Sequence, residues 1–133
     1  MQVVVDSSVL IALLLGEPER DAFHWALLGS DPVMSIANLT ETTLIARRRK
    51  RERAVAEVDL YVATYRIRIE PVTTEDFPLL RQALLRFGRG RRREPAVLNF
   101  GDLFAYALAM RLGLPLLFKG EDFARTDVQP VQY

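Results

Sequence analysis

The chain has 133 residues, half of them hydrophobic, which fits a single globular domain over residues 1–133 with a buried core. It has no cysteine, which excludes disulfides, zinc fingers and iron–sulfur clusters and is typical of a reducing cytosol. The N-terminus lacks the basic leader of a signal peptide, and no apolar run reaches the roughly 18 residues of a membrane span. We therefore expect a soluble, cytoplasmic protein without membrane contact.

The net charge is only +1, but the basic residues are concentrated in two clusters. The first consists of Arg47, Arg48, Arg49, Lys50, Arg51 and Arg53, and the second of Arg89, Arg91, Arg92 and Arg93. Such clusters neutralise phosphates and supply the sequence-independent part of nucleic-acid affinity. A solvated helix face beside a basic loop is the structural alternative. Two arginine clusters in one small domain favour a polyanion or an acidic partner protein.

Short apolar runs alternate along the chain with longer segments of helical pattern. In chain order we predict a strand at 2–5, helices at 9–15 and 17–28, a strand at 32–36, a helix at 38–46 continuing into the first basic cluster, a helix at 54–65, a strand at 66–72, a helix at 74–88, a loop at 88–98, a helix at 99–112, a strand at 114–118 and an edge strand at 128–131. This alternation predicts an α/β fold, in which a short parallel sheet is flanked by helices in three α/β/α layers.

Four acidic residues follow an apolar strand or open a helix, and they are far apart in the sequence: Asp6, Glu41, Asp102 and Asp122. In a parallel sheet, the carboxyl end of a strand and the start of the following helix lie at the same edge, where ligands of open α/β sheets bind. We therefore expect all four acids to meet there. Glu121 and Asp127 are alternatives to Asp122 as the fourth member, and Asp122 is favoured.

Helix capping offers a structural explanation for part of this pattern. Ser7 and Ser8 are positioned to cap the first helix. Both Asn38 with Glu41 and Asn99 with Asp102 have the spacing of a capping box, in which the acid accepts from the backbone of the cap residue.

Helical geometry argues that capping is not the whole account. At about 100° per residue, both acids share a helix face with apolar residues: Leu44 and Ile45 beside Glu41, and Ala105, Tyr106 and Ala109 beside Asp102. A carboxylate in apolar surroundings costs several kcal/mol unless a cation or metal pairs with it. Neither apolar face carries a lysine or arginine within one turn, so a bound cation would remove both costs.

A cluster of carboxylate oxygens suits Mg²⁺ or Mn²⁺ rather than zinc. The single histidine, His24, lies on a helix near Trp25, and we interpret it as structural. Carboxylate-held Mg²⁺ can activate water and stabilise the leaving oxygen in phosphodiester cleavage. The arginine clusters would then hold the substrate strand.

Several motifs, in the right order and over nearly the whole chain, resemble those of PIN-domain ribonucleases and, more narrowly, VapC toxins of bacterial type II toxin–antitoxin modules. They are Val3-Val4-Val5-Asp6-Ser7-Ser8, Thr40-Glu41-Thr42, Asn99-Phe100-Gly101-Asp102 with Tyr106-Ala107-Leu108-Ala109, and Pro115-Leu116-Leu117-Phe118-Lys119-Gly120-Glu121-Asp122-Phe123. One position departs from the pattern. Many PIN domains carry the last acid two residues before an Asp-Phe pair, where this chain has Gly120.

The resemblance implies a PIN-like fold and an Mg²⁺-dependent endoribonuclease, with Mn²⁺ as a substitute ion. It places Asp6, Glu41 and Asp102 in the metal site, with an acid of the last motif beside them and Ser8 near it. It also implies an RNA substrate, a homodimer, and a cognate antitoxin whose tail reaches the active site. Both arginine clusters could contact RNA or the antitoxin.

Two other functions are compatible with parts of the sequence. The first is a non-catalytic RNA- or protein-binding module that keeps the PIN fold. The second is a phosphotransferase with Asp6 as its nucleophile, although such enzymes need a second acid two residues later, where this chain has Ser8. The presence of all four acids favours the nuclease.

Overall fold

The computed structural model describes residues 1–50, 52–88 and 97–133. Within these ranges the strands are β1 (Gln2–Val5), β2 (Asp31–Ser35), β3 (Arg68–Glu70) and β4 (Leu116–Leu117). The helices are α1 (Ser7–Leu15), α2 (Arg20–Leu28), α3 (Ile36–Lys50), α4 (Glu52–Thr64), α5 (Phe77–Phe87) and α6 (Phe100–Leu112), with short 3₁₀ turns η1 (Thr74–Asp76) and η2 (Phe123–Arg125).

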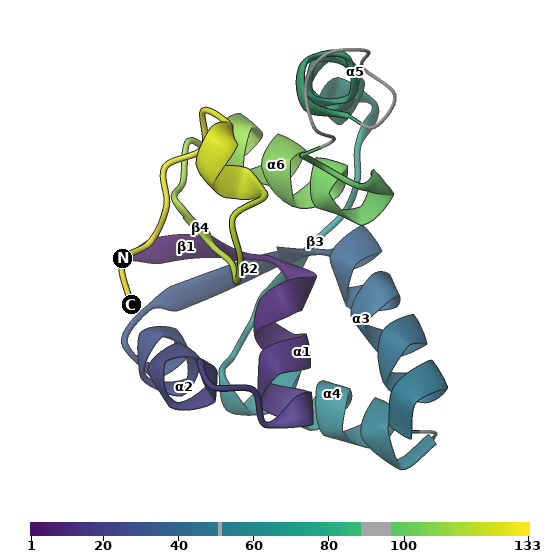
Figure 1. Ribbon diagram of the computed structural model, residues 1–133, viewed down its shortest axis with the longest axis vertical. Helices are drawn as coiled ribbons and strands as arrows, with labels where there is room; N and C mark the ends of the chain where they lie inside the picture. Colours follow the sequence, from purple (N-terminus) through teal and green to yellow (C-terminus); the bar gives the residue numbers. More distant parts are fainter. Residues whose placement is uncertain (51, 89–96) are drawn as a thin grey trace.

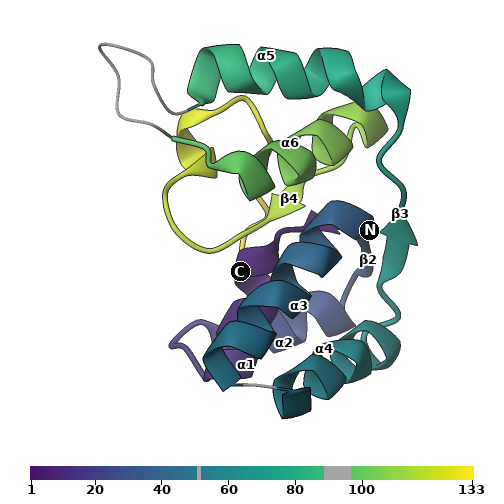
Figure 2. The ribbon, with the colours of Figure 1, turned by 90° about the vertical axis from the view of Figure 1, so that its right-hand side faces the viewer.

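The strands form one parallel sheet in the order β3-β2-β1-β4. Helices α5 and α6 cover one face of this sheet, and α1, α2, α3 and α4 lie on the other (Figure 1). The view turned by 90° shows the same three layers, with α5 outermost above α6 (Figure 2). The predicted α/β/α architecture is therefore confirmed. In the described part of the chain, none of the helices has the length and apolarity needed to cross a bilayer.

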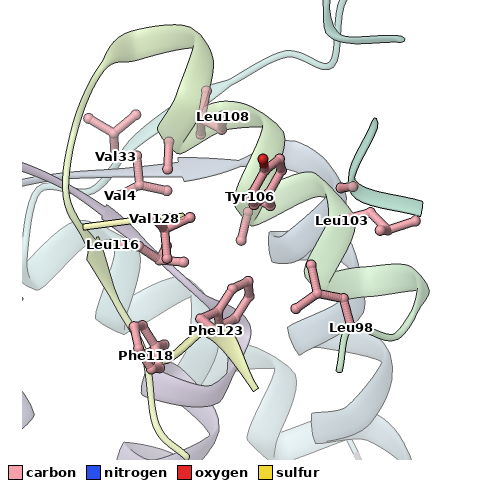
Figure 3. Packing of buried hydrophobic residues seen from close by; sticks show 13 residues of the cluster. Val4, Val33, Leu98, Leu103, Tyr106, Leu108, Leu116, Phe118, Phe123 and Val128 are labelled. Carbon is pink, nitrogen blue, oxygen red and sulfur yellow. The ribbon is translucent and has the colours of Figure 1, made fainter. Parts of the chain in front are cut away.

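Alternate side chains of the strands supply two separate apolar cores. Val4, Val33 and Leu116 face α6 and pack with residues such as Tyr106 and Phe123 (Figure 3). Val3, Val5, Met34 and Leu117 face the other way and pack against α1 and α2. Burial on both faces explains why the strands are continuous apolar runs rather than alternating ones.

The ends of the sheet differ from the prediction. β3 covers three residues of the predicted 66–72 and β4 two residues of the predicted 114–118. The predicted edge strand at 128–131 is wrong, because that segment makes only an isolated bridge between Leu116 and Pro130. This bridge consists of two hydrogen bonds, from Leu116 N to Gln129 O at 2.8 Å and from Val131 N to Leu116 O at 3.0 Å, and no ladder extends it among the described residues.

The predicted starts of α1 and α3 are also wrong, and α2 begins at Arg20 rather than at residue 17. Asp6 caps α1 in place of Ser7 or Ser8, because its Oδ2 accepts a hydrogen bond from the backbone N–H of Ser8 at 3.0 Å. α3 begins at Ile36, with the Ser35 hydroxyl accepting from Ala37 N, so Asn38 lies inside the first turn and forms no capping box. The box of Asn99 and Asp102 at the start of α6 is confirmed, with both of its hydrogen bonds present.

The chain order of the strands creates a switch point beside β1. From β1 the chain builds outward through β2 and β3, then returns through α5 and α6 to add β4 on the other side of β1. The connections therefore diverge between β1 and β4, and a crevice opens outside the carboxyl ends of these strands. Asp6 follows β1 at this point, and the segment with Asp122 follows β4.

Candidate functional site

A cleft of about 260 Å³ lies at the switch point, and all four predicted acids line it. Its walls are formed by Asp6, Ser7, Ser8, Ile11, Glu17, Glu41, Ile45, Asn99, Asp102, Lys119, Asp122 and Phe123. They come from α1 and the residues that flank it, from α3, from α6 and its cap residue, and from the segment that follows β4. The predicted convergence of four distant acids is therefore what the fold produces.

A second cleft, of about 500 Å³, lies at the amino ends of β1 and β2 between the end of α2 and the start of β3. Its charged side chains are Asp31, Arg66 and Arg68, so it has a single carboxylate. The smaller cleft at the carboxyl ends of the strands has the concentrated charge, and we take it as the candidate site.

Asp6 sits at the base of the cleft and is only 4% exposed. One carboxylate oxygen, Oδ2, accepts from Ser8 N as the cap of α1. The other, Oδ1, is buried and has no hydrogen-bond partner among the described residues. A buried, unpaired carboxylate oxygen costs free energy unless a cation or proton meets it.

Glu41 is held against the walls of the cleft by its neighbours. Its Oε1 accepts from the Ser7 hydroxyl at 2.5 Å and from the Asn38 amide at 3.4 Å. Its carboxylate also lies directly on Gly101, where an added Cβ would overlap all three carboxyl atoms. The apolar surroundings predicted for Glu41 are present only on one side, since Ile45 lines the cleft but Leu44 is 46% exposed.

Asp102 opens α6 and is only 9% exposed. Its Oδ2 accepts from Asn99 N at 3.0 Å, while its own N–H donates to the Asn99 side chain at 2.9 Å. The capping box therefore holds the Asp102 side chain at the cleft. Its capping role and a functional role in the cleft are compatible. The same two hydrogen bonds orient the first turn of α6 toward β1.

The three candidates for the fourth acid are now separated by position. Asp122 is exposed and lines the cleft, whereas Glu121 and Asp127 do not. Asp127 accepts a hydrogen bond from the Tyr106 hydroxyl at 2.8 Å and forms an ion pair with Arg86 at 3.3 Å. These partners engage Asp127 on α5 and α6, outside the cleft, so the geometry favours Asp122.

Two of the acids have pKa values close to neutrality. Burial raises the pKa of Asp6 to about 6, with a smaller contribution from the charge of Glu41. Burial likewise raises the pKa of Asp102 to about 7, and the negative charge of Asp6 raises it further. Both shifts show that the cleft disfavours uncompensated negative charge.

The donor chemistry of the cleft fits a hard divalent cation. The available groups are carboxylate oxygens, and Asp6 Oδ1 is buried without a partner in the described part of the chain. Within residues 1–50, 52–88 and 97–133, however, no three His, Cys, Asp or Glu side chains are arranged to hold one ion together. The type of donor atom therefore suits Mg²⁺. The positions of the described side chains, however, do not place three of them around one ion.

The predicted substrate-binding residues divide into three groups. Arg89, Arg91, Arg92 and Arg93, like Arg51, lie outside the described residues. Exposed residues 47–50 occupy the last turn of α3, where the helix dipole favours positive charge. Ser8 lines the cleft, and its hydroxyl accepts from the backbone N–H of Lys119 at 3.0 Å.

His24 lies away from the cleft. Its Nδ1 is 2.7 Å from the Tyr65 hydroxyl, and its ring packs edge-on against Trp25 and Tyr65. These contacts join α2 to the end of α4, in agreement with the structural role predicted for this histidine.

Sequence comparison places the chain among known proteins. It matches the PIN domain family over residues 3–129. A ribonuclease VapC from Mycolicibacterium smegmatis is 41% identical over 130 residues, which cover 96% of this chain and 98% of the relative. Ribonuclease VapC30 from Mycobacterium tuberculosis is 39% identical over 130 residues, which cover 96% of this chain and 97% of that relative. The chain belongs to the PIN-domain VapC family. The resemblance identified from the motifs is thereby confirmed.

Solved structures agree with this assignment at the level of the fold. VapC20 from Mycobacterium tuberculosis, described as a sarcin-ricin loop cleaving toxin, superposes with a TM-score of 0.78 at 21% identity and covers 97% of this chain and 98% of its own. A chain of the VapBC2 complex from Rickettsia felis, bound to a DNA fragment from its promoter, superposes with a TM-score of 0.73 at 14% identity. The match covers 99% of this chain and 98% of that one. The α/β/α arrangement is therefore that of VapC proteins.

Several residues at the cleft of this VapC-family chain were not singled out by sequence reasoning. In the sequence, both Asn38 and Ser7 fit the pattern of helix caps. Lys119 belongs to the last PIN-like motif, but its meeting with Glu17 depends on the fold and is not predicted by the sequence: Lys119 Nζ lies 2.9 Å from Glu17 and 3.0 Å from Glu19. Among the described residues that line the cleft, Lys119 is the basic one.

Proposed function

We propose that this protein is an Mg²⁺-dependent endoribonuclease that acts as the toxin of a type II toxin–antitoxin module. The observation that carries the proposal is the meeting of Asp6, Glu41, Asp102 and Asp122 in one cleft of a VapC-family chain. Relatives that share about two fifths of its sequence are named ribonucleases, and the acids lie where ligands of open α/β sheets bind.

The acids would hold Mg²⁺, or Mn²⁺ in its place, and a bound ion would supply activated water and charge stabilisation for phosphodiester cleavage. Mg²⁺ usually keeps several waters and takes one or two carboxylates from a protein. Asp6 and Asp102 suit this role because their carboxylates are buried and coupled by charge. Asp122 contributes negative charge from the exposed rim of the cleft.

Other groups of the protein order the carboxylates of the cleft and offer contacts to an RNA strand. The hydrogen bonds to Glu41 and Asp102 fix these carboxylates before the substrate arrives, which lowers the cost of ordering them during the reaction. Lys119, in the segment after β4, and Ser8, on α1, also line the cleft. Arg89, Arg91, Arg92 and Arg93 would contact RNA phosphates in an interaction that weakens with added salt.

Induced expression in a host that lacks the antitoxin tests the toxin assignment. We expect the wild-type protein to arrest growth and Asp6→Asn to leave growth unchanged, with both proteins present at equal levels. Asp127→Asn serves as the matched control, because Asp127 lies outside the cleft. Equal arrest by the wild type and Asp6→Asn would contradict the proposal, as would a wild-type protein that does not arrest growth.

A cognate antitoxin is the proposed partner. Structures with the same fold include VapBC complexes from Rickettsia felis and from Salmonella typhimurium. Co-expression with the product of a neighbouring small open reading frame should restore growth and yield a stable complex on purification. Growth arrest that persists in the presence of every neighbouring gene product would remove the antitoxin from the account.

We also propose a homodimer, whose interface involves the exposed apolar side chains of α5 and α6. Phe77, Leu84 and Leu85 on α5 and Phe100 on α6 are 57%, 51%, 65% and 76% exposed, and the two helices pack side by side (Figure 2). Several large exposed apolar side chains on neighbouring helices are typical of an interface. Light scattering should give about twice the 15.1 kDa of one chain.

Leu85→Glu should convert this dimer to a monomer. The matched control is Leu60→Glu on α4, a leucine that is 62% exposed on the other side of the sheet and should leave the dimer intact. A wild-type monomer at micromolar concentration would remove the dimer from the proposal.

The alternative function is a non-catalytic RNA- or protein-binding module with a PIN fold. It predicts RNA binding that falls steeply with salt but is unchanged by EDTA and by Asp102→Asn. The buried pair of Asp6 and Asp102 speaks against it, because a pure binding surface gains nothing from two desolvated carboxylates.

A further inference from the structure

Asn38 is fully buried in the first turn of α3, yet its side chain reaches across to α6. Its Nδ2 donates to the backbone carbonyl of Gly101 at 2.9 Å and to Glu41 Oε1 at 3.4 Å. Gly101 directly precedes Asp102 in the first turn of α6. One amide therefore joins the helix that carries Glu41 to the turn that carries Asp102.

The surroundings of Glu41 leave its carboxylate little freedom. Ser7, one residue after Asp6, donates its hydroxyl to the same Oε1 at 2.5 Å. On the opposite side the carboxyl group lies on Gly101, at a distance that only a residue without a Cβ permits. The polar groups of Ser7 and Asn38 and the bare backbone of Gly101 thus form a socket for the Glu41 carboxylate, referred to below as the Glu41 socket.

The polar bonding of Asn38 is hard to explain by stability alone. Its Oδ1 is buried and has no hydrogen-bond partner among the described residues, a cost that an apolar side chain of similar size would avoid. Its Nδ2, in contrast, serves two acceptors at the cleft. A side chain that costs stability while holding a carboxylate in place is typical of positioning residues around metal ligands.

We propose that Asn38 is a positioning residue, which holds Glu41 in the Glu41 socket and keeps it in register with Asp102. This inference rests on the proposed function, since it assigns Glu41 its place in the metal-binding cleft. Groups that orient ligands in this way typically change metal affinity about 10–100-fold when removed. Gly101 is also part of the Glu41 socket, because any residue with a Cβ at this position would displace the Glu41 carboxylate.

The test measures Mn²⁺ affinity by calorimetry for the wild type, Asn38→Ala, Glu41→Ala and the double variant. We expect Asn38→Ala to weaken Mn²⁺ binding about 10–100-fold in the wild type, and by less than about twofold once Glu41 is absent. RNA cleavage by Asn38→Ala should show a lower kcat with little change in KM. An equal loss of affinity in both backgrounds would overturn the proposal, as would wild-type affinity in Asn38→Ala.

Two further variants separate positioning from folding. Asn38→Leu keeps the branched shape at Cγ while removing the amide, so it should reproduce the affinity loss without the cavity that Asn38→Ala leaves. Thr42→Val is the matched control: Thr42 is equally buried on α3, and its hydroxyl bonds only to the carbonyl of Asn38 in its own helix. It should bind Mn²⁺ within about twofold of the wild type.

Thermal unfolding of the metal-free proteins provides a readout that needs neither ion nor RNA. Gly101→Ala should lower the unfolding midpoint in the wild type and at most half as much in the Glu41→Ala background, where the overlapping carboxylate is gone. Asn38→Ala should show the same dependence on Glu41. Equal decreases in both backgrounds would overturn the Glu41 socket even if Mg²⁺-dependent cleavage were demonstrated. If the wild type neither binds Mn²⁺ nor cuts RNA, the proposed function fails, and these unfolding data alone decide the interaction of Asn38 with Glu41.

Discussion

At the scale of single residues, the candidate site buries two carboxylates, and their negative charge destabilises the folded state in the absence of a cation. Asp6 and Asp102 are nearly buried, and the pKa of each is raised toward neutrality. The sequence predicted this cost from the apolar neighbours of Asp102. It could not predict the Glu41 socket, because the register of α3 against α6 depends on packing between segments about sixty residues apart.

The raised pKa values predict how stability depends on pH. Between the unfolded value of 3.8 and the folded values of about 6 and about 7, the folded state binds more protons than the unfolded chain. The contribution of these groups to the free energy of unfolding therefore falls as pH rises from about 4 to about 7. Asp102→Asn removes part of this loss and should stabilise the metal-free protein at pH 8 by on the order of 1–3 kcal/mol.

Urea unfolding at pH 5 and pH 8 checks this prediction. The gain from Asp102→Asn should be larger at pH 8 than at pH 5, where Asp102 in the wild type is largely protonated. A variant that is less stable than the wild type at pH 8 would show that Asp102 is stabilised by partners in its capping box more than it is destabilised by burial.

The departure at Gly120 also belongs to the residue scale. Its φ is 95°, in the region that residues with a Cβ rarely adopt. An acid at this position, as in many PIN domains, would be strained in the turn seen here. Of the acids in the last motif, it is Asp122, two residues further on, that lines the cleft.

At the scale of elements, the same residues serve as helix caps and as members of the cleft. Asp6 begins α1 and Asp102 completes the capping box of α6. The sequence predicted the start of α6 correctly because Asn99 has no competitor nearby. It misplaced the starts of α1 and α3, since Asp6, Ser7 and Ser8 are all good caps, and Ser35 lies three residues before Asn38.

The dual role of Asp6 predicts different effects for two substitutions. Asn caps helices about as well as Asp, whereas Ala loses about 1 kcal/mol. Asp6→Asn should therefore have a higher melting temperature than Asp6→Ala in the absence of metal, although both remove the negative charge. Circular dichroism at 222 nm would measure both. Equal melting temperatures would show that the hydrogen bond to Ser8 contributes nothing to α1.

At the scale of the whole molecule, strand order is what assembles the site. The sequence predicted the alternation of strands and helices, and with it the edge of the sheet where the acids meet. The full extent of β4 and the fate of residues 128–131 could not be predicted, because short runs beside Pro115 and Pro130 have no strong periodicity. Two residues of β4 nevertheless suffice to bring Asp122 beside Asp6, since Leu117 pairs with Val5.

RNA cleavage by the purified protein tests the central claim most directly. Wild type and Asp102→Asn would be incubated with a structured RNA at pH 8, with Mg²⁺ or with excess EDTA, and the new RNA ends counted over time. We predict that the wild type cleaves RNA with Mg²⁺ and does not cleave it with EDTA. The cleavage rate of Asp102→Asn should fall by more than the roughly 10–100-fold expected for a residue that only orients a metal ligand. Cleavage that persists in EDTA, or equal rates for the two proteins, would contradict the account.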